Sequence, residues 1–401
     1  MRATVTPLLL ALGGMLVPQA GQATAPTVVP LEVESRHVVV AADPRSFLGW
    51  PSINGFWIWE GGREMLVGYS AGRFAERAHH NIKPGPVQSR LARSRDGGRS
   101  WTTWDPTDFV GDGGERQELP APLPFTAEGF ALRAVGTGYH GSSDPLGSFF
   151  TSLDRGDTWT GPFGFAGLPD EPEMKDGKGK LRENTTRTSY LVTGPESCLF
   201  FMSARRGQYR DKCFVASTDD GGRSVQFRSW IVPPDDPHRA VMPAAVRRPD
   251  GEIVVALRRR VPDDAQASCW IDAYASADEG HTWSYRGRVD ETGTENGNPP
   301  ALVGLPDGRL ACCYGDRAAR DGIFLKLSDD AGRTWGEALP LRTDYQPDRF
   351  DDSDLGYPVA GVNDRKELIV IYYWATRERP AQHIAATLVP LAALPSGGAS
   401  R

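Results

Sequence analysis

Arginine and histidine side chains in short clusters are the residues of this chain best suited to chemistry on an anionic ligand. Arg258, Arg259 and Arg260 are consecutive. In an extended strand the side chains alternate between two faces, so Arg258 and Arg260 share one face and Arg259 points to the other. The planar guanidinium group binds a carboxylate through two hydrogen bonds. We therefore expect part of this run to bind a carboxylate and the remainder to be solvated.

His79 and His80 form a second cluster, in a polar stretch of the sequence. An imidazole titrates near neutral pH, so it can donate and accept a proton during catalysis. A histidine and a tyrosine with arginines nearby form a set suited to proton abstraction or glycosidic cleavage on an acidic sugar. The alternative interpretation is a surface loop with two solvated histidines.

The composition excludes several other kinds of function. The 401 residues include 45 Lys and Arg against 51 Asp and Glu, which gives a net charge of −6. Nucleic-acid binding needs a basic face, so this balance argues against it. No spacing of Cys and His resembles a zinc site, and no glycine-rich loop resembles a phosphate-binding loop. We expect no cofactor, and nothing in the sequence indicates a structural calcium ion.

One octapeptide pattern, Ser-x-Asp-x-Gly-x-Thr-Trp, occurs five times with small variations. Glycine adopts the positive φ of a tight turn, Asp and Ser or Thr bond the amides of the turn, and Trp packs beneath it. A turn of this kind joins two antiparallel strands. The copies occupy residues 94–101, 152–159, 218–225, 276–283 and 328–335.

The starts of successive copies are 58, 66, 58 and 52 residues apart. Each interval has room for one four-stranded sheet, β-branched runs precede the octapeptides, and helical periodicity is scarce. We predict an all-β fold, a six-bladed β-propeller. The sixth blade, residues 358–390, lacks the octapeptide, and we expect residues 36–40 to pair with it and close the ring. A β-sandwich with an appended domain fits the even spacing poorly.

The first 23 residues have the order of a secretory signal peptide. Arg2 is followed by an apolar stretch from Leu8 to Val17 and then by small and polar residues. The apolar stretch is too short to span a bilayer as a helix. We therefore expect residues 24–401 to form one propeller domain that is exported to the periplasm or the extracellular space and is monomeric. The alternative is an uncleaved membrane anchor.

The five cysteines leave at least one thiol unpaired. Cys198 and Cys213 are equidistant from residues 205–206, so a hairpin with its tip there would bring the two sulfurs together in a disulfide. The other three cysteines lie in apolar runs, and we expect them to be buried thiols.

The octapeptides resemble the Asp-boxes of the sialidase-like propellers, and with their context the chain is similar to the bacterial sialidase family from about Phe47 to Leu388. The resemblance implies that the Asp-box aspartates are structural and lie on the outer rim. It also implies a central cleft in which three arginines hold the sugar carboxylate, a Tyr paired with a Glu is the nucleophile, and an Asp is the acid/base. A phenol suits this task because a carboxylate nucleophile would be repelled by the carboxylate of the substrate.

Two segments of this sequence resemble the family segments that contain these catalytic and binding residues. Residues 242–258 resemble the family's stretch from its catalytic Glu to its second arginine. Arg258 matches that arginine, whereas Met242 occupies the Glu position. Residues 354–360 resemble the stretch around the family's nucleophile, so that Tyr357 is the candidate nucleophile.

Other positions depart from the family pattern. The third arginine should precede the last Asp-box, where Arg317 and Arg320 both stand and either could serve. Where the family has Arg-Ile-Pro at the start of the first blade, this chain has Gly-Trp-Pro at residues 49–51. The acid/base Asp should follow the first strand, but residues 69–73 contain no carboxylate. One arginine, the Glu and the Asp are therefore absent at the expected positions.

Several further polar residues are expected where propeller loops face the cleft. Trp50 could stack on a sugar ring, and Asp354 could act as a base for the phenol of Tyr357. A core position for Trp50 and a turn-capping role for Asp354 are the alternatives. The remaining candidates for substrate binding are Arg187, Tyr190, Asn296 and Arg320.

Together these residues predict a glycosidase of the exo-α-sialidase type that acts on a terminal acidic sugar of a glycan. Arg258 and Arg317 would bind the carboxylate. Tyr357 would be the nucleophile or general base, and His80 would be the acid/base. An elimination on a uronic-acid polysaccharide is the close variant. Since the Glu and Asp carboxylates are absent, a non-catalytic carbohydrate-binding propeller is the alternative from a different class.

Overall fold

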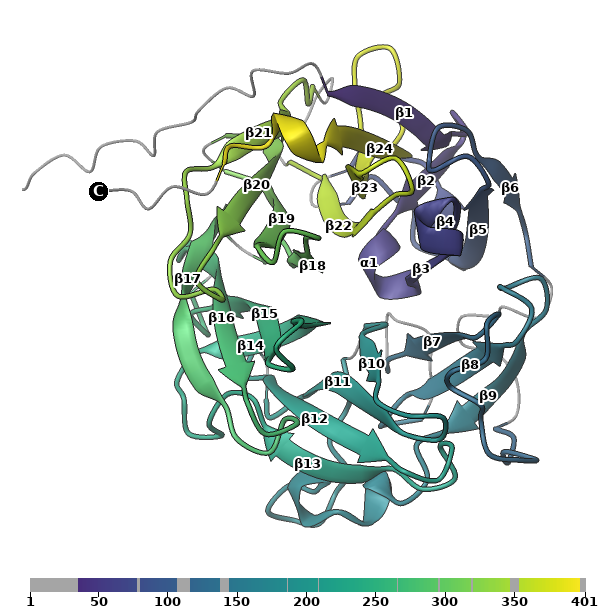
Figure 1. Cartoon of the computed structure of the whole chain (residues 1–401), viewed down its shortest axis with the longest axis vertical. Coiled ribbons are helices and arrows are strands. Elements are labelled where there is room, and N and C mark those ends of the chain that lie inside the picture. The colour runs from purple at the N-terminus through teal and green to yellow at the C-terminus, as the bar shows by residue number, and fades with distance from the viewer. Residues whose placement is uncertain are drawn as a thin grey trace, which may run out of the picture.

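The computed structural model describes residues 35–77, 80–106, 116–137, 144–185, 187–207, 209–264, 266–294, 296–318, 320–346 and 353–396. These residues form six antiparallel sheets arranged in a ring (Figure 1), which confirms the six-bladed β-propeller. The first strand of each blade lies toward the centre of the ring and the last lies toward the outside. The expected signal peptide, residues 1–23, lies outside the described residues.

The first three blades follow one another along the chain, and the only α-helix among the described residues, α1 (Pro51–Asn54), interrupts the first of them. Blade 1 contains β2 (Ser46–Gly49), β3 (Phe56–Trp59), β4 (Glu64–Arg73), β5 (Gln88–Ser94) and β6 (Thr102–Trp104). Blade 2 contains β7 (Ala131–Val135), β8 (Ser148–Ser152) and β9 (Thr160–Gly164). Blade 3 contains β10 (Tyr190–Val192), β11 (Cys198–Ala204), β12 (Lys212–Thr218) and β13 (Gln226–Trp230).

The last three blades have four strands each, and the sixth takes its outermost strand from the N-terminal part of the chain. Blade 4 contains β14 (Arg239–Arg247), β15 (Ile253–Arg260), β16 (Cys269–Ser276) and β17 (Ser284–Gly293). Blade 5 contains β18 (Ala301–Gly304), β19 (Leu310–Asp316), β20 (Gly322–Ser328) and β21 (Leu339–Arg342). Blade 6 contains β22 (Gly356–Val362), β23 (Glu367–Trp374), β24 (His383–Pro390) and β1 (Arg36–Ala41).

The hydrophobic core consists of apolar layers between neighbouring blades, which we call seams. In β11, Phe200 packs in the seam with blade 2, whereas Leu199 and Phe201 pack in the seam with blade 4. In β23, Tyr372 faces blade 5 and Tyr373 faces blade 1. Because a strand's side chains alternate between its two faces and both faces are buried, the central strands are apolar almost throughout.

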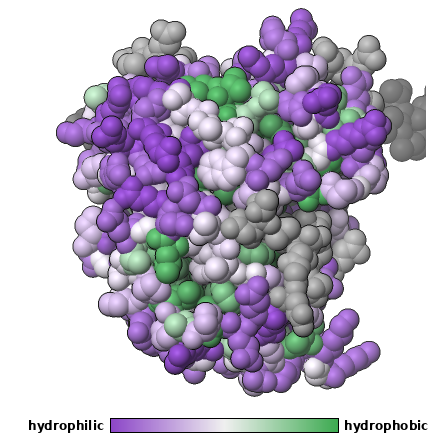
Figure 2. All heavy atoms as spheres, turned by 90° about the vertical axis from the view of Figure 1, so that its right-hand side faces the viewer, coloured by the Kyte–Doolittle hydropathy of each residue, from purple (hydrophilic) through white to green (hydrophobic). Residues whose placement is uncertain are grey.

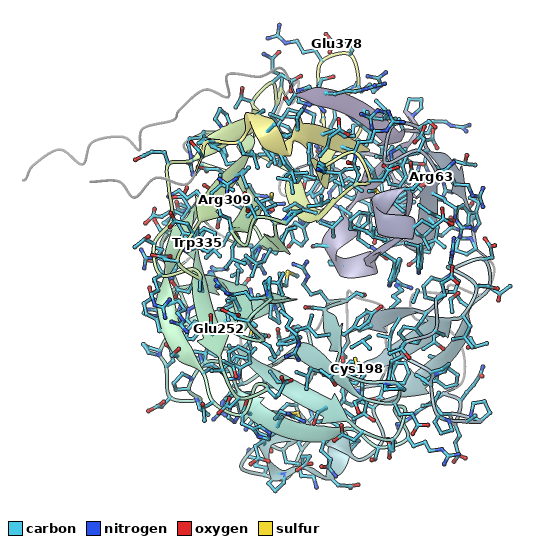
Figure 3. The ribbon with its side chains drawn as sticks, in the orientation of Figure 1. Arg63, Cys198, Glu252, Arg309, Trp335 and Glu378 are labelled. Atoms are coloured by element: carbon cyan, nitrogen blue, oxygen red, sulfur yellow. The ribbon has the colours of Figure 1, made fainter. Side chains whose placement is uncertain are left out.

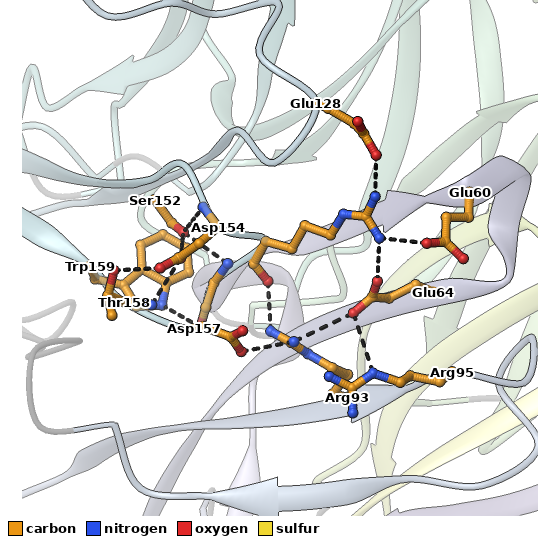
Figure 4. Close-up of polar contacts among 12 residues, drawn as sticks. Glu60, Glu64, Arg93, Arg95, Glu128, Ser152, Asp154, Asp157, Thr158 and Trp159 are labelled. Atoms are coloured by element: carbon orange, nitrogen blue, oxygen red, sulfur yellow. Dashed lines mark hydrogen bonds and ion pairs between the residues drawn. The ribbon is translucent and has the colours of Figure 1, made fainter.

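Each octapeptide joins two antiparallel strands, as predicted, and these are the last two strands of its blade. In the second copy, Ser152 Oγ donates to Asp154 Oδ1 at 2.7 Å and accepts from the Gly156 N–H at 2.8 Å. Asp154 also accepts bonds from the backbone N–H and the hydroxyl of Thr158 (Figure 4). The Trp159 indole donates to the Gly156 carbonyl at 3.1 Å and packs beneath the turn. The aspartate therefore closes the turn, which is the structural role expected of it.

The second octapeptide also connects two blades through charge. Arg155, within the turn, pairs with Glu60 at 2.6 Å, with Glu64 at 2.7 Å and with Glu128 (Figure 4). Glu64 lies in β4 of blade 1 and also pairs with Arg93 of β5 at 3.4 Å. A network of this kind holds several side chains in one geometry, unlike an isolated surface pair.

The ring closes where the N-terminal strand β1 pairs with β24, with Arg36 opposite Leu388. This confirms the predicted closure by residues 36–40. In the other blades one turn carries the chain from the next-to-last strand to the outermost strand. In blade 6 these two strands, β24 and β1, come from opposite ends of the chain, so no turn joins them and no octapeptide is needed.

The predicted disulfide between Cys198 and Cys213 is wrong, because all five cysteines are free. In the hairpin of β11 and β12, Cys198 lies opposite Thr218 and Cys213 lies opposite Ser203. The two thiols also face different seams, toward blade 2 and blade 4 respectively. Strand β11 ends at Ala204 and β12 begins at Lys212, so residues 205–206 lie at the start of the connecting loop and not at its centre. Cys198 lies inside blade 3, whereas Trp335 of the fifth octapeptide lies at the outer edge (Figure 3).

Polar residues cover most of the edge of the ring that Figure 2 shows, and its apolar residues form separate patches. The described part of the chain contains no helix that is long and apolar enough to cross a bilayer.

The octapeptide aspartates are expected to make the fold sensitive to acid. The hydroxyl and backbone N–H of Thr282, together with the hydroxyl of Ser276, lower the pKa of Asp278 from 3.8 to about 2. Because the pKa is depressed in the folded state, this stabilisation is complete above pH 3.8 and is lost as the pH falls toward 2. In Asp278→Asn we expect a melting temperature about 2–4 °C below that of wild type at pH 7. Between pH 4 and 2 the melting temperature of the variant should fall less than that of wild type.

Thermal unfolding of wild type and variant at a series of pH values tests this. Asp219→Asn is the matched control, because Asp219 is exposed at the variable second position of the third octapeptide. Equal pH profiles for Asp278→Asn and wild type would contradict the role assigned to Asp278.

Candidate functional site

Three blades interrupt their inner strand at a residue that precedes proline. Trp50, Met242 and Tyr357 have φ angles of 55°, 55° and 48°, and each is followed by proline. Trp50 separates β2 from α1, and the register of β14 and of β22 shifts at the other two residues. Positive φ costs a non-glycine residue about 1–2 kcal/mol. Such interruptions re-aim side chains beside functional sites, and these three side chains pack in one cluster.

Asn298 fixes the backbone at Tyr357. Its side-chain carbonyl accepts the Tyr357 N–H at 2.7 Å, and its amide donates to the Leu355 carbonyl at 3.1 Å. Gly356 makes this close approach possible, because a Cβ there would lie 2.3 Å from Asn298 Oδ1 and because its φ is 101°. Asn298 is fully buried, so it positions Tyr357 rather than facing solvent.

Two arginines face the phenol of Tyr357. Arg258 donates to Tyr357 Oη at 3.3 Å, and the guanidinium carbon of Arg317 lies 5.3 Å from the centre of the Tyr357 ring. Burial alone would raise the pKa of Tyr357, but the positive charges of Arg258 and then Arg317 lower it below 10. The structure therefore brings together the three residues that the sequence assigned to nucleophile and carboxylate binding, and the two arginine charges make the phenol easier to ionise.

His80 belongs to a hydrogen-bonded chain that ends at Arg317. His80 Nδ1 donates to Asp354 Oδ1 at 2.8 Å, and Tyr373 Oη donates to the same oxygen at 2.7 Å. Arg317 in turn donates to Tyr373 Oη. Asp354 is 2% exposed, and burial alone would raise its pKa. The bond and charge of His80, then Arg317 and Tyr373, lower the pKa of this carboxyl instead.

Trp50 completes this side of the site. Its ring lies 5.2 Å from the imidazole of His80, edge to face, and 4.9 Å from the ring of Phe47. The imidazole is thus held between the carboxylate of Asp354 and an aromatic wall. Since Asp354 occupies Nδ1, the second ring nitrogen, Nε2, is the atom of His80 that remains for a ligand.

These residues border a cavity of about 1040 Å³ at the centre of the ring. Its lining includes Tyr357, Arg258, His80 and Trp50, together with residues from blades 2 and 3. A cavity of this size accommodates a small oligosaccharide. Among the described residues there is no group of three His, Cys, Asp or Glu side chains that could hold a metal ion.

The model of one protein family, the BNR repeat-like domain, matches residues 87–366, which is well over half of the chain. The chain belongs to the BNR repeat-like domain family. No curated protein matches its sequence.

Solved structures show that this BNR repeat-like chain shares its fold with proteins of several kinds. A Dyadobacter fermentans protein of unknown function is 20% identical with a TM-score of 0.66, and the match covers 88% of this chain and 97% of that one. The α-L-arabinanase of Penicillium chrysogenum, solved with arabinobiose, is 15% identical with a TM-score of 0.57 and coverages of 90% and 99%. Trypanosoma rangeli sialidase is 13% identical with a TM-score of 0.55 and coverages of 89% and 60%. The expected sialidase-like propeller is therefore confirmed as a fold.

Two of the expected cleft residues of this BNR repeat-like propeller lie at a different level of its channel. Arg187 and Tyr190 line a second cavity of about 400 Å³. Arg187 donates to the Pro300 carbonyl at 2.9 Å, and burial and then the charge of Arg258 lower its pKa to about 10. The hydroxyl of Tyr190 accepts the Leu132 N–H at 3.3 Å. Arg187 is thus close enough to act on the site electrostatically, whereas Tyr190 joins blades 2 and 3.

The two candidates for the third arginine are separated by the structure. Arg320 pairs with Asp316 at 2.5 Å and with Asp290 at 3.1 Å, and it does not line the large cavity. These two carboxylates already pair with the guanidinium group of Arg320, so its role in substrate binding stays a prediction that this geometry does not favour. Asn296 does line the cavity and accepts a bond from Arg260 at 3.1 Å. The expectation for His79 falls outside the described residues.

Several residues of the cavity were missed in the sequence. Arg133, inside the apolar strand β7, donates to Asn54 Oδ1 at 2.8 Å and to Ser89 Oγ at 2.7 Å. Arg239 of β14 pairs with Asp211 at 2.7 Å. An arginine within an apolar run is a signal that can be found in the sequence, because a buried charge needs a functional or structural partner. The loop residues Tyr209 and Asp211 carry no such signal.

The lowered pKa of Tyr357 is testable without a substrate. In wild type we expect one tyrosine to ionise below pH 10, ahead of the others, and Tyr357→Phe to remove this transition. In Arg258→Met the transition should move upward, because the largest opposing charge is lost while the burial remains. Ultraviolet difference titration of tyrosinate absorbance measures both effects. Tyr285→Phe is the control, since Tyr285 is exposed and its pKa is raised. A low transition that survives in Tyr357→Phe would disprove the assignment.

Proposed function

We propose that this protein is a glycosidase that releases a terminal acidic sugar from a glycan, in the manner of an exo-α-sialidase. The observation that carries the proposal is the contact of a buried Tyr357 phenol with Arg258, both of which line an open cavity, and with Arg317 beside the Tyr357 ring. The similarity of the fold to that of Trypanosoma rangeli sialidase supports it.

The two arginines suit the carboxylate of such a sugar. Arg317 is anchored by the Leu355 carbonyl through Nε and Nη2, at 3.0 and 2.7 Å. Its Nη1 group makes no hydrogen bond to a described residue that would compete with a ligand. Arg258 has Tyr357 as its hydrogen-bond partner and has no ion pair among the described residues. Neither guanidinium group has an ion pair among the described residues, so each keeps the capacity to bind an anion through charge-assisted hydrogen bonds.

The phenol and the imidazole suit the two chemical steps. Tyr357, as phenolate, attacks the anomeric carbon while the glycosidic bond breaks, and protonated His80 gives its Nε2 proton to the leaving oxygen. In the second step, neutral His80 takes a proton from water, the water oxygen attacks the anomeric carbon, and the bond to Tyr357 breaks. Asp354 stays ionised throughout and holds the imidazole in place.

A second candidate is an elimination on a uronic acid, which the scarcity of carboxylates at the site favours. Met242 stands where the resembling family has its Glu, and the one carboxylate in the described lining, Asp211, is bonded to Arg239. In this reaction the arginines neutralise the sugar carboxylate and the Tyr357 phenolate removes the neighbouring proton. His80 then protonates the leaving oxygen, and the product contains a carbon–carbon double bond.

The experiment that separates these candidates is incubation of the purified protein with sialosides, uronic-acid polysaccharides and sulfated glycans. Reducing ends and ultraviolet absorbance are read together. Released sialic acid supports the first candidate, and a product that absorbs in the ultraviolet supports elimination. Binding without any product would show a carbohydrate-binding propeller and would refute both catalytic candidates.

Substitutions at the two reacting residues are expected to abolish turnover. Tyr357→Phe should lower kcat by about 10³-fold or more, because no nucleophile or base remains. His80→Gln should lower it by about 10²–10⁴-fold, as expected for a general acid. The measurement is kcat on whichever substrate the panel identifies.

His238→Gln is a closely matched control for His80→Gln. His238 is 38% exposed where His80 is 39%, lies 4.0 Å from Asp236, and packs edge to face on Trp270 at 5.1 Å. It does not line the cavity. Equal activity of the His80 and His238 variants would refute the role of His80.

A further inference from the structure

The lining of the large cavity is strongly cationic although the chain is acidic. Of the described side chains that line it, six are positive and one, Asp211, is negative, whereas the whole chain has a net charge of −6. The six are Arg77, Lys83, Arg133, Arg205, Arg239 and Arg258. A single sugar carboxylate would neutralise only part of this charge.

The positive charge concentrates at the end of blade 4 that borders the cavity. Arg239 of β14 lies directly opposite Arg260 of β15, and Arg258 is two residues before Arg260, on the same face. Exposed fractions are 6% for Arg239, 4% for Arg260 and 3% for Arg258. Like charges that face each other across two strands destabilise a sheet, and buried charges need compensation.

Compensation from the described residues is incomplete. Arg239 pairs with Asp211, but neither Arg258 nor Arg260 has an ion pair within the described ranges. Arg260 contacts two neutral side chains that line the cavity. It donates to Asn296 at 3.1 Å, and its guanidinium carbon lies 4.0 Å from the centre of the Tyr209 ring. Arg239 lies 5.3 Å from the same ring.

We propose that this end of blade 4 is a second anion subsite, formed by Arg239, Arg260, Tyr209 and Asn296, for an acidic group on the sugar next to the one that is cleaved. The proposal rests on the proposed function, since it places the cleaved sugar at Arg258 and Tyr357. Alternate residues of a strand are about 7 Å apart, so Arg258 and Arg260 place two separate cationic groups along the same face of β15. The substrate is therefore a glycan with a carboxylate or sulfate on each of two neighbouring residues.

The rest of the cavity wall offers a weaker site for this group. Arg77 and Lys83 are exposed, so solvent screens their charges. Arg133 already donates to Asn54 and Ser89. The end of blade 4 is where two cations without an ion pair lie beside a third, and this places the second acidic group there.

Binding in the Tyr357→Phe background tests the subsite without turnover. Calorimetric titration compares the affinity for a chondroitin disaccharide without sulfate with the affinity for the same disaccharide carrying one sulfate on the hexosamine. A second comparison uses methyl galacturonoside and digalacturonate, so that the two arms distinguish sulfate from carboxylate. In at least one pair we expect the probe with two negative charges to bind about tenfold more tightly than the probe with one. An effect of this size is typical of one charge-assisted hydrogen bond.

Two variants locate the preference. Arg260→Gln removes the cation, and Asn296→Asp places a carboxylate beside it at an exposed position where the fold is kept. Each should reduce the preference to less than about threefold. Arg63→Gln is the control, because Arg63 is exposed on blade 1 and does not line the cavity (Figure 3). Thermal unfolding verifies that each variant is folded.

The outcomes separate the subsite from the proposed function. Equal binding of both members of each pair, no binding of any probe, or a preference that survives in Asn296→Asp would overturn the subsite. A dianion preference that Asn296→Asp removes establishes the subsite even if no glycan is cleaved in the activity panel. Cleavage without a dianion preference leaves the glycosidase and refutes the subsite.

Discussion

Each blade of this propeller is buried on both faces, and the placement of every polar group follows from that constraint. Neighbouring sheets share an apolar seam on each side, so the side chains of a central strand enter one seam or the other. A charged side chain within a central strand therefore needs a polar partner, as Arg133 of β7 has in Asn54 and Ser89. The interruptions at Trp50, Met242 and Tyr357 lie at the centre of the ring. They open the seams to the cavity, and the arginines gather around them.

Specific hydrogen-bond partners stabilise the strained backbone at these interruptions. At Tyr357 the buried Asn298 accepts the backbone N–H, and the absence of a side chain at Gly356 makes room for it. The phenol is thereby fixed beside two guanidinium groups. Among the described residues no carboxylate is bonded to it, so its ionisation depends on these charges and not on a neighbouring base. This differs from the arrangement that the family resemblance implies, in which a Glu activates the tyrosine.

The fold could be predicted from the sequence because its signal is local and repeated. Each octapeptide forms its turn from its own hydrogen bonds, and the spacing then determines the number of blades. The site depends on residues far apart in sequence, such as His80 and Asp354, which are 274 positions apart. Arg317 and Arg320 could not be distinguished, because the carboxylates that hold Arg320 lie in two different strands. The hairpin of Cys198 was misjudged for a similar reason, since the loop length is set by tertiary contacts and not by the midpoint between two cysteines.

Asp354 connects the two halves of the site. One of its oxygens accepts bonds from both His80 and Tyr373, and the other accepts the Asn81 N–H at 3.1 Å. These bonds and the charge of Arg317 keep its pKa low although it is buried, so it remains an anion when His80 gives up its proton. A carboxylate that does not titrate with the imidazole fixes its orientation and leaves Nε2 as the atom that exchanges protons. Because Tyr373 also accepts from Arg317, the proposed acid/base residue, His80, and the proposed carboxylate-binding residue, Arg317, share one anchor. In the proposed reaction this rigid part of the protein would fix the distance between the sugar's carboxylate and its leaving oxygen, which would favour cleavage at one bond next to an acidic group.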